Sequence, residues 1–234
     1  MPDMSGQPTQ PSTVVLVAGA GWGGSLWEPV AERLGKAGHT VLAPTLTGLG
    51  ELAALASPEV DLDTHVDDVV RALTERGLAD VVLVGHSYAG MVITGVAELV
   101  PERLRRLVYV DALVPLDGEA DVDILDQHLV DDILAARDRG EWLIPLAPDA
   151  PAGMAPHPIA TVTQPVRVRS AAAARVPRTY VRCTHSRLSF TRLCAERAVA
   201  AGWRCVELDS GHLPMTTSPD DLAALLVDEA AAGT

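Results

Sequence analysis

Short apolar runs, rich in β-branched residues, alternate along the chain with stretches that have the periodicity of amphipathic helices. The runs cover residues 14–18, 40–43, 81–84, 107–110, 179–183 and 204–208. Strands that are apolar at nearly every position are buried on both faces, which is typical of a parallel sheet covered by helices on either side. The pattern therefore predicts an α/β fold with a mainly parallel sheet.

Two of the predicted helices have recognisable ends. Asp63 can cap a helix that has one apolar face, and Gly77 lies beyond the C-terminal end of that helix. Ser218, followed by Pro219, starts the last helix in the same way. Both helices fit the alternation of strand and helix that an α/β fold requires.

One long segment interrupts this alternation. Roughly seventy residues separate the run that ends near Asp111 from the run that starts at Thr179, although a connection between strand and helix usually takes a handful. Residues 119–139 have helical spacing, and the part after them is rich in proline. Ligands bind beyond the carboxyl ends of strands in open α/β sheets, so we expect a small helical and proline-rich cap there, over about residues 113–176. The whole chain, 1–234, is then expected to form a single domain.

Composition and charge narrow the classes of partner. The 234 residues are 48% hydrophobic and 21% charged, which is typical of a folded globular chain, and the formal net charge is -13. Such a surface repels nucleic acid and anionic membranes, and no apolar run is long enough to span a membrane. The polar, proline-rich start lacks the features of a secretory leader. We therefore expect a soluble, cytoplasmic protein that acts on a small-molecule substrate. The sequence does not exclude a homodimer.

Nothing in the pattern of cysteines and acidic residues points to a metal site. The three cysteines are an odd number at wide spacing, which argues against a disulfide framework and against zinc. The acidic residues of the cap lack metal-loop spacing, and we interpret them as the solvated face of the cap helix. They are Asp121, Asp123, Asp126, Asp131 and Asp132.

The most specific motif joins an apolar strand to a helix. It reads Gly85-His86-Ser87-Tyr88-Ala89, a close match to the G-x-S-x-G turn that lifts a nucleophilic serine above the sheet. His212 follows the last predicted strand, in a loop from which a histidine can take the proton of a serine at the end of a central strand. Together they predict a nucleophile at Ser87 and its base at His212, while His86 is expected to pack beside the turn.

These motifs carry a resemblance to a known family. Residues 27–34, residues 43–51 and the serine turn resemble the small-cap α/β-hydrolases, a group that includes plant methyl esterases and hydroxynitrile lyases. The resemblance runs from about Val14 to Leu226. It implies a six-stranded parallel sheet, a reaction without cofactor, and an oxyanion hole made by the backbone N–H groups of Ala20 and Tyr88. The family's histidine before the glycine at Gly19 is missing, but backbone donors do not depend on it.

The acid of the family's triad is also missing. The family has C-T-x-D after the fifth strand, whereas this chain has Ser186 at the position of the aspartate. Asp111, at the end of the preceding strand, could supply the carboxylate instead, although it could also simply cap the turn into Ala112. Alternatively, Ser186 or a carbonyl could orient His212 in a slower enzyme. The pocket could also have been turned to non-hydrolytic chemistry or to binding alone.

Dinucleotide binding and hydroxynitrile lyase activity fit the residues less well. The glycines of Gly19–Gly24 match the dinucleotide pattern G-x-G-x-x-G, but Pro44 and Thr45 stand where that fold needs an acid. Hydroxynitrile lyases of the group place a lysine directly after the catalytic histidine, where this chain has Leu213. An esterase is therefore favoured over a lyase.

The sequence thus predicts a cofactor-independent carboxylic ester hydrolase that acts on a small or medium apolar ester. Trp22, Trp142 and Leu213 are candidates for the walls of its substrate pocket. The alternative is a cyclase, dehydratase or lyase of secondary metabolism, or a binding protein, that reuses the hydrolase pocket. The missing acid at Ser186 motivates that alternative, because a non-hydrolytic pocket need not contain an activated serine.

Overall fold

A six-stranded parallel sheet forms the centre of the part of the chain that the structure describes. The structure is a computed structural model and describes residues 11–148 and 150–232. The strand order is β2-β1-β3-β4-β7-β8, and every neighbouring pair is parallel. The strands are β1 Thr13–Val17, β2 Thr40–Leu42, β3 Val81–His86, β4 Leu104–Val110, β7 Arg178–Cys183 and β8 Arg204–Leu208. The predicted fold class is therefore confirmed.

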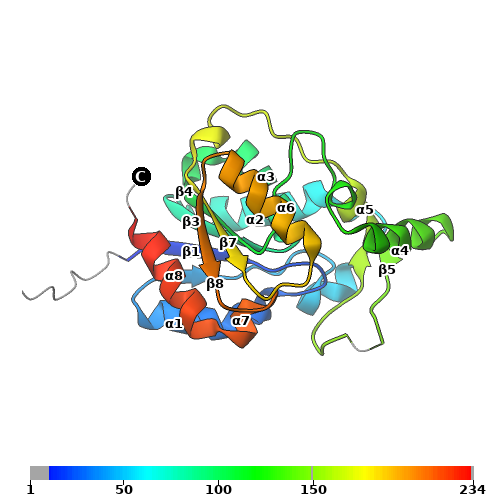
Figure 1. The fold of residues 1–234 in the computed structure, drawn as a ribbon, viewed down its shortest axis with the longest axis horizontal. Coiled ribbons are helices and arrows are strands. Elements are labelled where there is room, and N and C mark those ends of the chain that lie inside the picture. Colours follow the sequence, from blue (N-terminus) through cyan, green and yellow to red (C-terminus); the bar gives the residue numbers. More distant parts are fainter. Residues whose placement is uncertain (1–10, 149, 233–234) are drawn as a thin grey trace, which may run out of the picture.

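Helices cover both faces of this sheet (Figure 1). One face carries α1 (Glu28–Lys36), α7 (Pro214–Thr217) and α8 (Pro219–Ala231), and the other carries α2 (Leu62–Thr74), α3 (Ala89–Leu99) and α6 (Ser189–Ala200). Along β1, Val15 and Val17 belong to one core and Val14 and Leu16 to the other. Because successive strand side chains point to opposite faces, an uninterrupted apolar run fills two cores at once.

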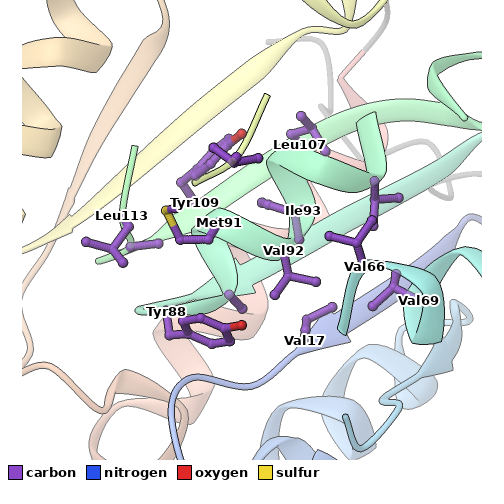
Figure 2. Packing of buried hydrophobic residues seen from close by; sticks show 14 of the residues in the cluster. Val17, Val66, Val69, Tyr88, Met91, Val92, Ile93, Leu107, Tyr109 and Leu113 are labelled. Atoms are coloured by element: carbon purple, nitrogen blue, oxygen red, sulfur yellow. The ribbon is translucent and has the colours of Figure 1, made fainter. Parts of the chain in front are cut away.

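The core beneath α2 and α3 fixes the position of the serine turn. Figure 2 shows Val66 of α2 beside Ile93 of α3, with Tyr109 of β4 nearby, and all three are buried. Tyr88, directly after Ser87, belongs to the same cluster and is 2% exposed. The start of α3, directly after the nucleophile position, is therefore anchored by packing.

Helix α2 begins two residues earlier than the sequence pattern predicts. Asp61, with extended backbone, is its N-cap: the Asp61 carboxylate accepts the Thr64 N–H at 2.9 Å, and the Thr64 hydroxyl accepts the Asp61 N–H. Asp63, the predicted N-cap residue, instead accepts a hydrogen bond at 2.9 Å from the side-chain amide of Gln164, which lies in the long segment between β4 and β7. The prediction was wrong because Thr64 three residues after Asp61 completes a reciprocal capping box. Ser218 does precede α8, but its side chain makes no capping hydrogen bond.

Most of the long segment between β4 and β7 lies beyond the carboxyl ends of the strands, and its last part returns to the start of β7 (Figure 1). Its elements are η4 (Asp121–Asp123), α4 (Gln127–Asp138), β5 (Leu143–Ile144), β6 (His157–Pro158), α5 (Ile159–Thr163) and η5 (Ala173–Arg175), with β5 and β6 antiparallel. The helix expected over 119–139 is shorter, because extended backbone at Asp126 separates the 3-10 turn η4 from α4.

Short 3-10 turns complete the connections: η1 Gly24–Trp27, η2 Gly50–Leu55 and η3 Pro101–Arg103. η1 follows β1 and leads directly into α1, whereas η2 lies between β2 and α2. Among the described residues, none of the helices combines the length and the apolar character needed to cross a membrane.

Candidate active site

Ser87 occupies a strained turn between β3 and α3. Its φ angle is 53°, in the left-handed region that non-glycine residues rarely adopt. The turn is held by hydrogen bonds from the Ser87 N–H to the Val110 carbonyl at 3.3 Å and from the Leu113 N–H to the Ser87 carbonyl at 3.1 Å. A Cβ atom at Gly85 would lie 2.8 Å from the Ala89 carbonyl oxygen, which explains the glycine at that position. The sequence-predicted elbow geometry is therefore present.

Three side chains from distant loops form a chain of hydrogen bonds. His212 Nε2 lies 3.0 Å from Ser87 Oγ, and His212 Nδ1 lies 2.7 Å from Asp111 Oδ2. Because a carboxylate only accepts, Nδ1 carries the proton and Nε2 presents its lone pair to the Ser87 hydroxyl. The structure thus brings together Ser87, His212 and Asp111, in the tautomeric arrangement that a general base requires.

The position of Asp111 is set by its backbone conformation, and its carboxylate accepts a second hydrogen bond besides the one from His212. It follows β4 directly, has a φ angle of 46°, and is fully buried. Its Oδ1 accepts the Cys183 N–H at 3.2 Å, while its own N–H donates to the Val181 carbonyl at 2.7 Å. Its side chain therefore spans from the end of β7 to His212. In the described part of the chain, Ser186 Oγ is buried without a hydrogen-bond partner and makes no contact of this kind with His212.

His86 holds the loop that carries His212. Its Nε2–H donates to the His212 carbonyl at 2.7 Å, and the two imidazole rings lie 4.7 Å apart. Burial, followed by the proximity of His212, lowers the pKa of His86 well below its ordinary value, so this histidine stays neutral. The expectation that His86 packs beside the elbow without ionising agrees with this geometry.

Two backbone N–H groups beside Ser87 are available to a ligand. Ala20 and Tyr88 both line the same cavity as Ser87. Neither the Ala20 N–H nor the Tyr88 N–H has a hydrogen-bond acceptor among the described residues. The loop carrying Ala20 passes so close to Ser87 that a Cβ atom at Gly19 would lie 2.9 Å from Ser87 Cβ. These are the two donors that the family resemblance implies for an oxyanion hole.

A buried polar network that the sequence did not suggest connects this loop to the cap. The Gly21 N–H donates to His157 Nδ1 at 3.1 Å, so His157 Nε2–H donates to Thr161 Oγ1 at 2.7 Å. On the other side, the Tyr88 hydroxyl lies 2.9 Å from His65 Nδ1. Burial lowers the pKa of His157 well below its ordinary value. No sequence signal marks His65 or His157, because each is a single histidine in a different element.

The cavity above Ser87 has a volume of about 720 Å³ and is lined mainly by apolar side chains from the cap and from the loops after the strands. Trp22 and Leu213 line it as predicted. Trp142 is outside its lining and is 37% exposed, so that prediction was wrong. The residue precedes β5, and its carbonyl accepts the Ile159 N–H at 2.9 Å. Unpredicted lining residues include Leu125, Leu129, Ile133, Ile144, Met154, Val162 and Phe190.

The acidic residues of the cap do not share one environment. Asp123, Asp131 and Asp132 are exposed and Asp126 is half-buried, but Asp121 is 3% exposed and lines the cavity. The interpretation of Asp121 as part of a solvated helix face was therefore wrong. Residues 121–123 form the separate turn η4, so Asp121 does not follow the exposed face of α4. Burial raises the pKa of the Asp121 carboxyl group to about 8.

Within the described ranges, no group of three or more histidine, cysteine, aspartate or glutamate side chains could hold a metal ion. The cysteines Cys183 and Cys194 are buried and Cys205 is exposed, and all three are free thiols. Burial raises the pKa of Cys194 to about 12, so this thiol stays protonated.

Comparison with known proteins agrees with the fold. The Alpha/beta hydrolase family matches residues 14–225. A carbendazim hydrolyzing esterase from Nocardioides sp. is 35% identical over 234 residues, which cover 91% of this chain and 97% of that protein. The solved structure of an extracellular alpha/beta-hydrolase from a Paenibacillus species has a TM-score of 0.79 at 25% identity, covering 93% of this chain and 98% of that one.

A methylesterase from Arabidopsis has a TM-score of 0.70 at 20% identity, covering 93% of this chain and 98% of that one, which shows a shared fold alone. The resemblance to the group that includes plant methyl esterases is thereby confirmed. Relatives that match over nearly the full chain are named as an esterase and a hydrolase. The chain is a member of the alpha/beta hydrolase family, which acts on small molecules, and it is an esterase-like hydrolase.

Proposed function

We propose that the protein is a cofactor-independent carboxylic ester hydrolase in which Ser87 is the nucleophile, His212 the general base and Asp111 the acid that orients it. The observation that carries the proposal is the hydrogen-bonded series from Asp111 through His212 to Ser87, at 2.7 and 3.0 Å. A serine beside a histidine that is oriented by a buried carboxylate is the arrangement used for acyl transfer on unrelated folds.

The first half of the proposed reaction forms an acyl-enzyme. Ser87 Oγ attacks the ester carbonyl carbon while His212 Nε2 takes the hydroxyl proton. The negative charge that develops on the carbonyl oxygen is met by the N–H groups of Ala20 and Tyr88. As the intermediate collapses, the bond to the alkoxy group breaks and His212 returns the proton to that leaving oxygen, which departs as the alcohol.

The second half regenerates Ser87. A water molecule attacks the acyl carbon, His212 takes one of its protons, and the bond to Ser87 Oγ breaks as the serine recovers a proton. The products are the alcohol and the carboxylic acid. Asp111 stays ionised in this scheme and stabilises the imidazolium that forms at His212 in each half-reaction.

The lining of the cavity supports an apolar substrate of small or medium size. A volume of about 720 Å³ falls in the range of pockets that enclose drug-sized ligands. Leu125, Ile133 and Phe190 supply apolar walls from the cap and from α6. The relative from Nocardioides is named for carbendazim, a methyl carbamate of an aromatic heterocycle, so carbamate esters belong beside carboxylic esters in a substrate panel.

The position of Asp111 weakens the argument for non-hydrolytic chemistry or for binding alone. That alternative followed from the absence of a carboxylate at Ser186, whereas Asp111 now lies within hydrogen-bond distance of His212. We therefore place ester hydrolysis ahead of a cyclase, dehydratase, lyase or binding protein. The cytoplasmic location, the role in secondary metabolism, the single-domain organisation and the homodimer stay predictions of the sequence.

The first test is labelling with a fluorophosphonate, followed by intact-mass measurement. The wild-type protein should gain one adduct, and a folded Ser87→Ala variant should gain none. Ser186→Ala is the matched control, because it removes another serine hydroxyl and should label like wild type. If the wild-type protein stays unlabelled, and also fails to hydrolyse 4-nitrophenyl butyrate, the acyl-transfer mechanism is excluded.

A further inference from the structure

Asp121 is a carboxyl group that borders the cavity without a partner of its own. The residue is 3% exposed, yet it lines the cavity above Ser87. Its Oδ1 has no hydrogen-bond donor among the described residues. Most of the other cap side chains that line the cavity are apolar, including Leu125, Leu129, Ile133 and Val162, and the charged ones are the exposed Asp132 and Arg139. Oδ1 itself is closed to the cavity, so a polar group entering the cavity would meet the carboxyl group at Oδ2, for which the described residues supply no donor either.

Folding alone does not account for an acid at this position. The Asp121 backbone carbonyl, not its side chain, accepts the N–H groups of Ile124 and Leu125 at 2.9 and 3.1 Å. A buried carboxyl group without a partner destabilises the folded state relative to an apolar side chain of similar volume. Residues that break the packing rules at a cavity are expected where binding or catalysis requires them.

We propose that Asp121 is a substrate-binding residue that accepts a hydrogen bond from an N–H group on an otherwise apolar ester or carbamate. This inference rests on the proposed function and deepens it by naming the substrate class. In an apolar cavity, one hydrogen bond to such an acceptor should favour the N–H ligand roughly ten- to a hundredfold over a ligand of the same shape without it.

The pH dependence of this preference has a definite sign. Burial raises the pKa of Asp121 to about 8, so the group is mostly neutral at pH 7 and mostly ionised at pH 9. A carboxylate accepts an N–H more strongly than a neutral acid does, so the preference for the N–H ligand should grow with pH. Other titratable or charged groups on the elements around Asp121 include Glu119, Asp123, Asp132, Arg139, His86, Tyr88, His157, Cys194, Arg197 and His212. The ratio of the two affinities removes every effect of pH that acts on both ligands equally, and the substitutions at Asp121 described below assign what remains.

The test uses pairs of ligands that differ only in the donor. Methyl indole-4-, 5- and 6-carboxylates carry a ring N–H, and the corresponding benzofuran esters have oxygen in its place. Binding is measured by isothermal titration calorimetry in the Ser87→Ala background, which prevents turnover. At least one indole ester should bind tenfold or more tightly than its benzofuran partner at pH 7, and the ratio should be larger at pH 9.

Two further substitutions in that background assign the preference to Asp121. Asp121→Leu should abolish the ratio and raise the stability of the fold, whereas Asp121→Asn should keep the preference at pH 7, because its amide carbonyl still accepts an N–H, and should lose the change with pH. If every indole ester binds like its benzofuran partner in the Ser87→Ala protein, or if Asp121→Leu keeps the preference, the inference is overturned. The pH arm needs no substitution at Asp121, so the test stands even if Asp121→Leu fails to fold.

Failure of the proposed function would give a different result. Wild-type protein that binds the ligands with the expected ratio, but hydrolyses neither these esters nor 4-nitrophenyl butyrate, would refute ester hydrolysis and leave the role of Asp121 intact. Wild-type protein that hydrolyses 4-nitrophenyl butyrate, but binds each pair equally in the Ser87→Ala background, would refute the role of Asp121 alone.

Discussion

Replacing Asp111 with asparagine changes one carboxylate oxygen to an NH₂ group at a fully buried position of the candidate active site. The Asp111 carboxylate currently accepts two hydrogen bonds, from the Cys183 N–H at 3.2 Å and from His212 Nδ1–H at 2.7 Å. In Asp111→Asn, the amide oxygen can keep the bond from Cys183. The amide NH₂ then faces His212 Nδ1, which must give up its proton to accept the new donor.

The consequence reaches Ser87. With Nδ1 as an acceptor, the imidazole proton moves to Nε2, which can no longer take the proton of the Ser87 hydroxyl. Asp111 is fully buried, so water cannot replace the lost carboxylate. A loss of about 10⁴ in kcat is expected from the wrong tautomer, which corresponds to about 5.4 kcal/mol of transition-state stabilisation.

The assay is steady-state hydrolysis of a 4-nitrophenyl ester, with circular dichroism to verify that the variant is folded. Asp209→Asn is the matched control, because Asp209 lies in the same loop as His212 but bonds the exposed His185 at 2.6 Å. The control should retain wild-type activity. An Asp111→Asn enzyme within tenfold of the wild-type kcat would refute the assignment of Asp111 as the orienting acid.

Three further predictions concern the surroundings of the site. His157→Phe removes the acceptor of the Gly21 N–H and should lower kcat about tenfold with less change in KM, since it disturbs the loop that carries one oxyanion donor; equal changes in both constants would contradict this. Gly19→Ala places a methyl group 2.9 Å from Ser87 Cβ and should cost at least about 1–3 kcal/mol in urea denaturation, whereas Gly35→Ala, with open space around it, should be neutral or stabilising by up to about 1 kcal/mol. The free energy of unfolding should fall below about pH 6.5, by up to about 1.4 kcal/mol per pH unit for each histidine whose pKa is lowered by burial, because the unfolded chain then binds protons that the folded chain excludes. Asp121, whose pKa burial raises, offsets the uptake of one of these protons. Unfolding curves that do not change between pH 7.0 and 5.5 would contradict this prediction. These histidines are His39, His65, His86 and His157.

The sequence by itself determined the features that depend on neighbouring residues. The apolar run at 81–84 predicts a buried parallel strand because both of its faces need apolar cover, and the structure has β3 at Val81–His86. The turn at Ser87 could be recognised because Gly85 and Ala89 are small where the backbone bends sharply. At the start of α2, the sequence placed the helix but not its cap, because Asp63 was predicted and Asp61 caps the helix instead.

The tertiary structure decided which side chains meet across long stretches of chain. Asp111 and His212 are 101 residues apart, and their contact depends on the order in which β4, β7 and β8 lie side by side. The burial of Asp121 and the exposure of Trp142 depend on how the cap folds over the strand ends, which proline content and helical spacing do not specify. Local propensities determine each element, whereas the contacts between elements follow from packing of the whole chain, and the environment of a carboxyl group, with its pKa, is determined only there.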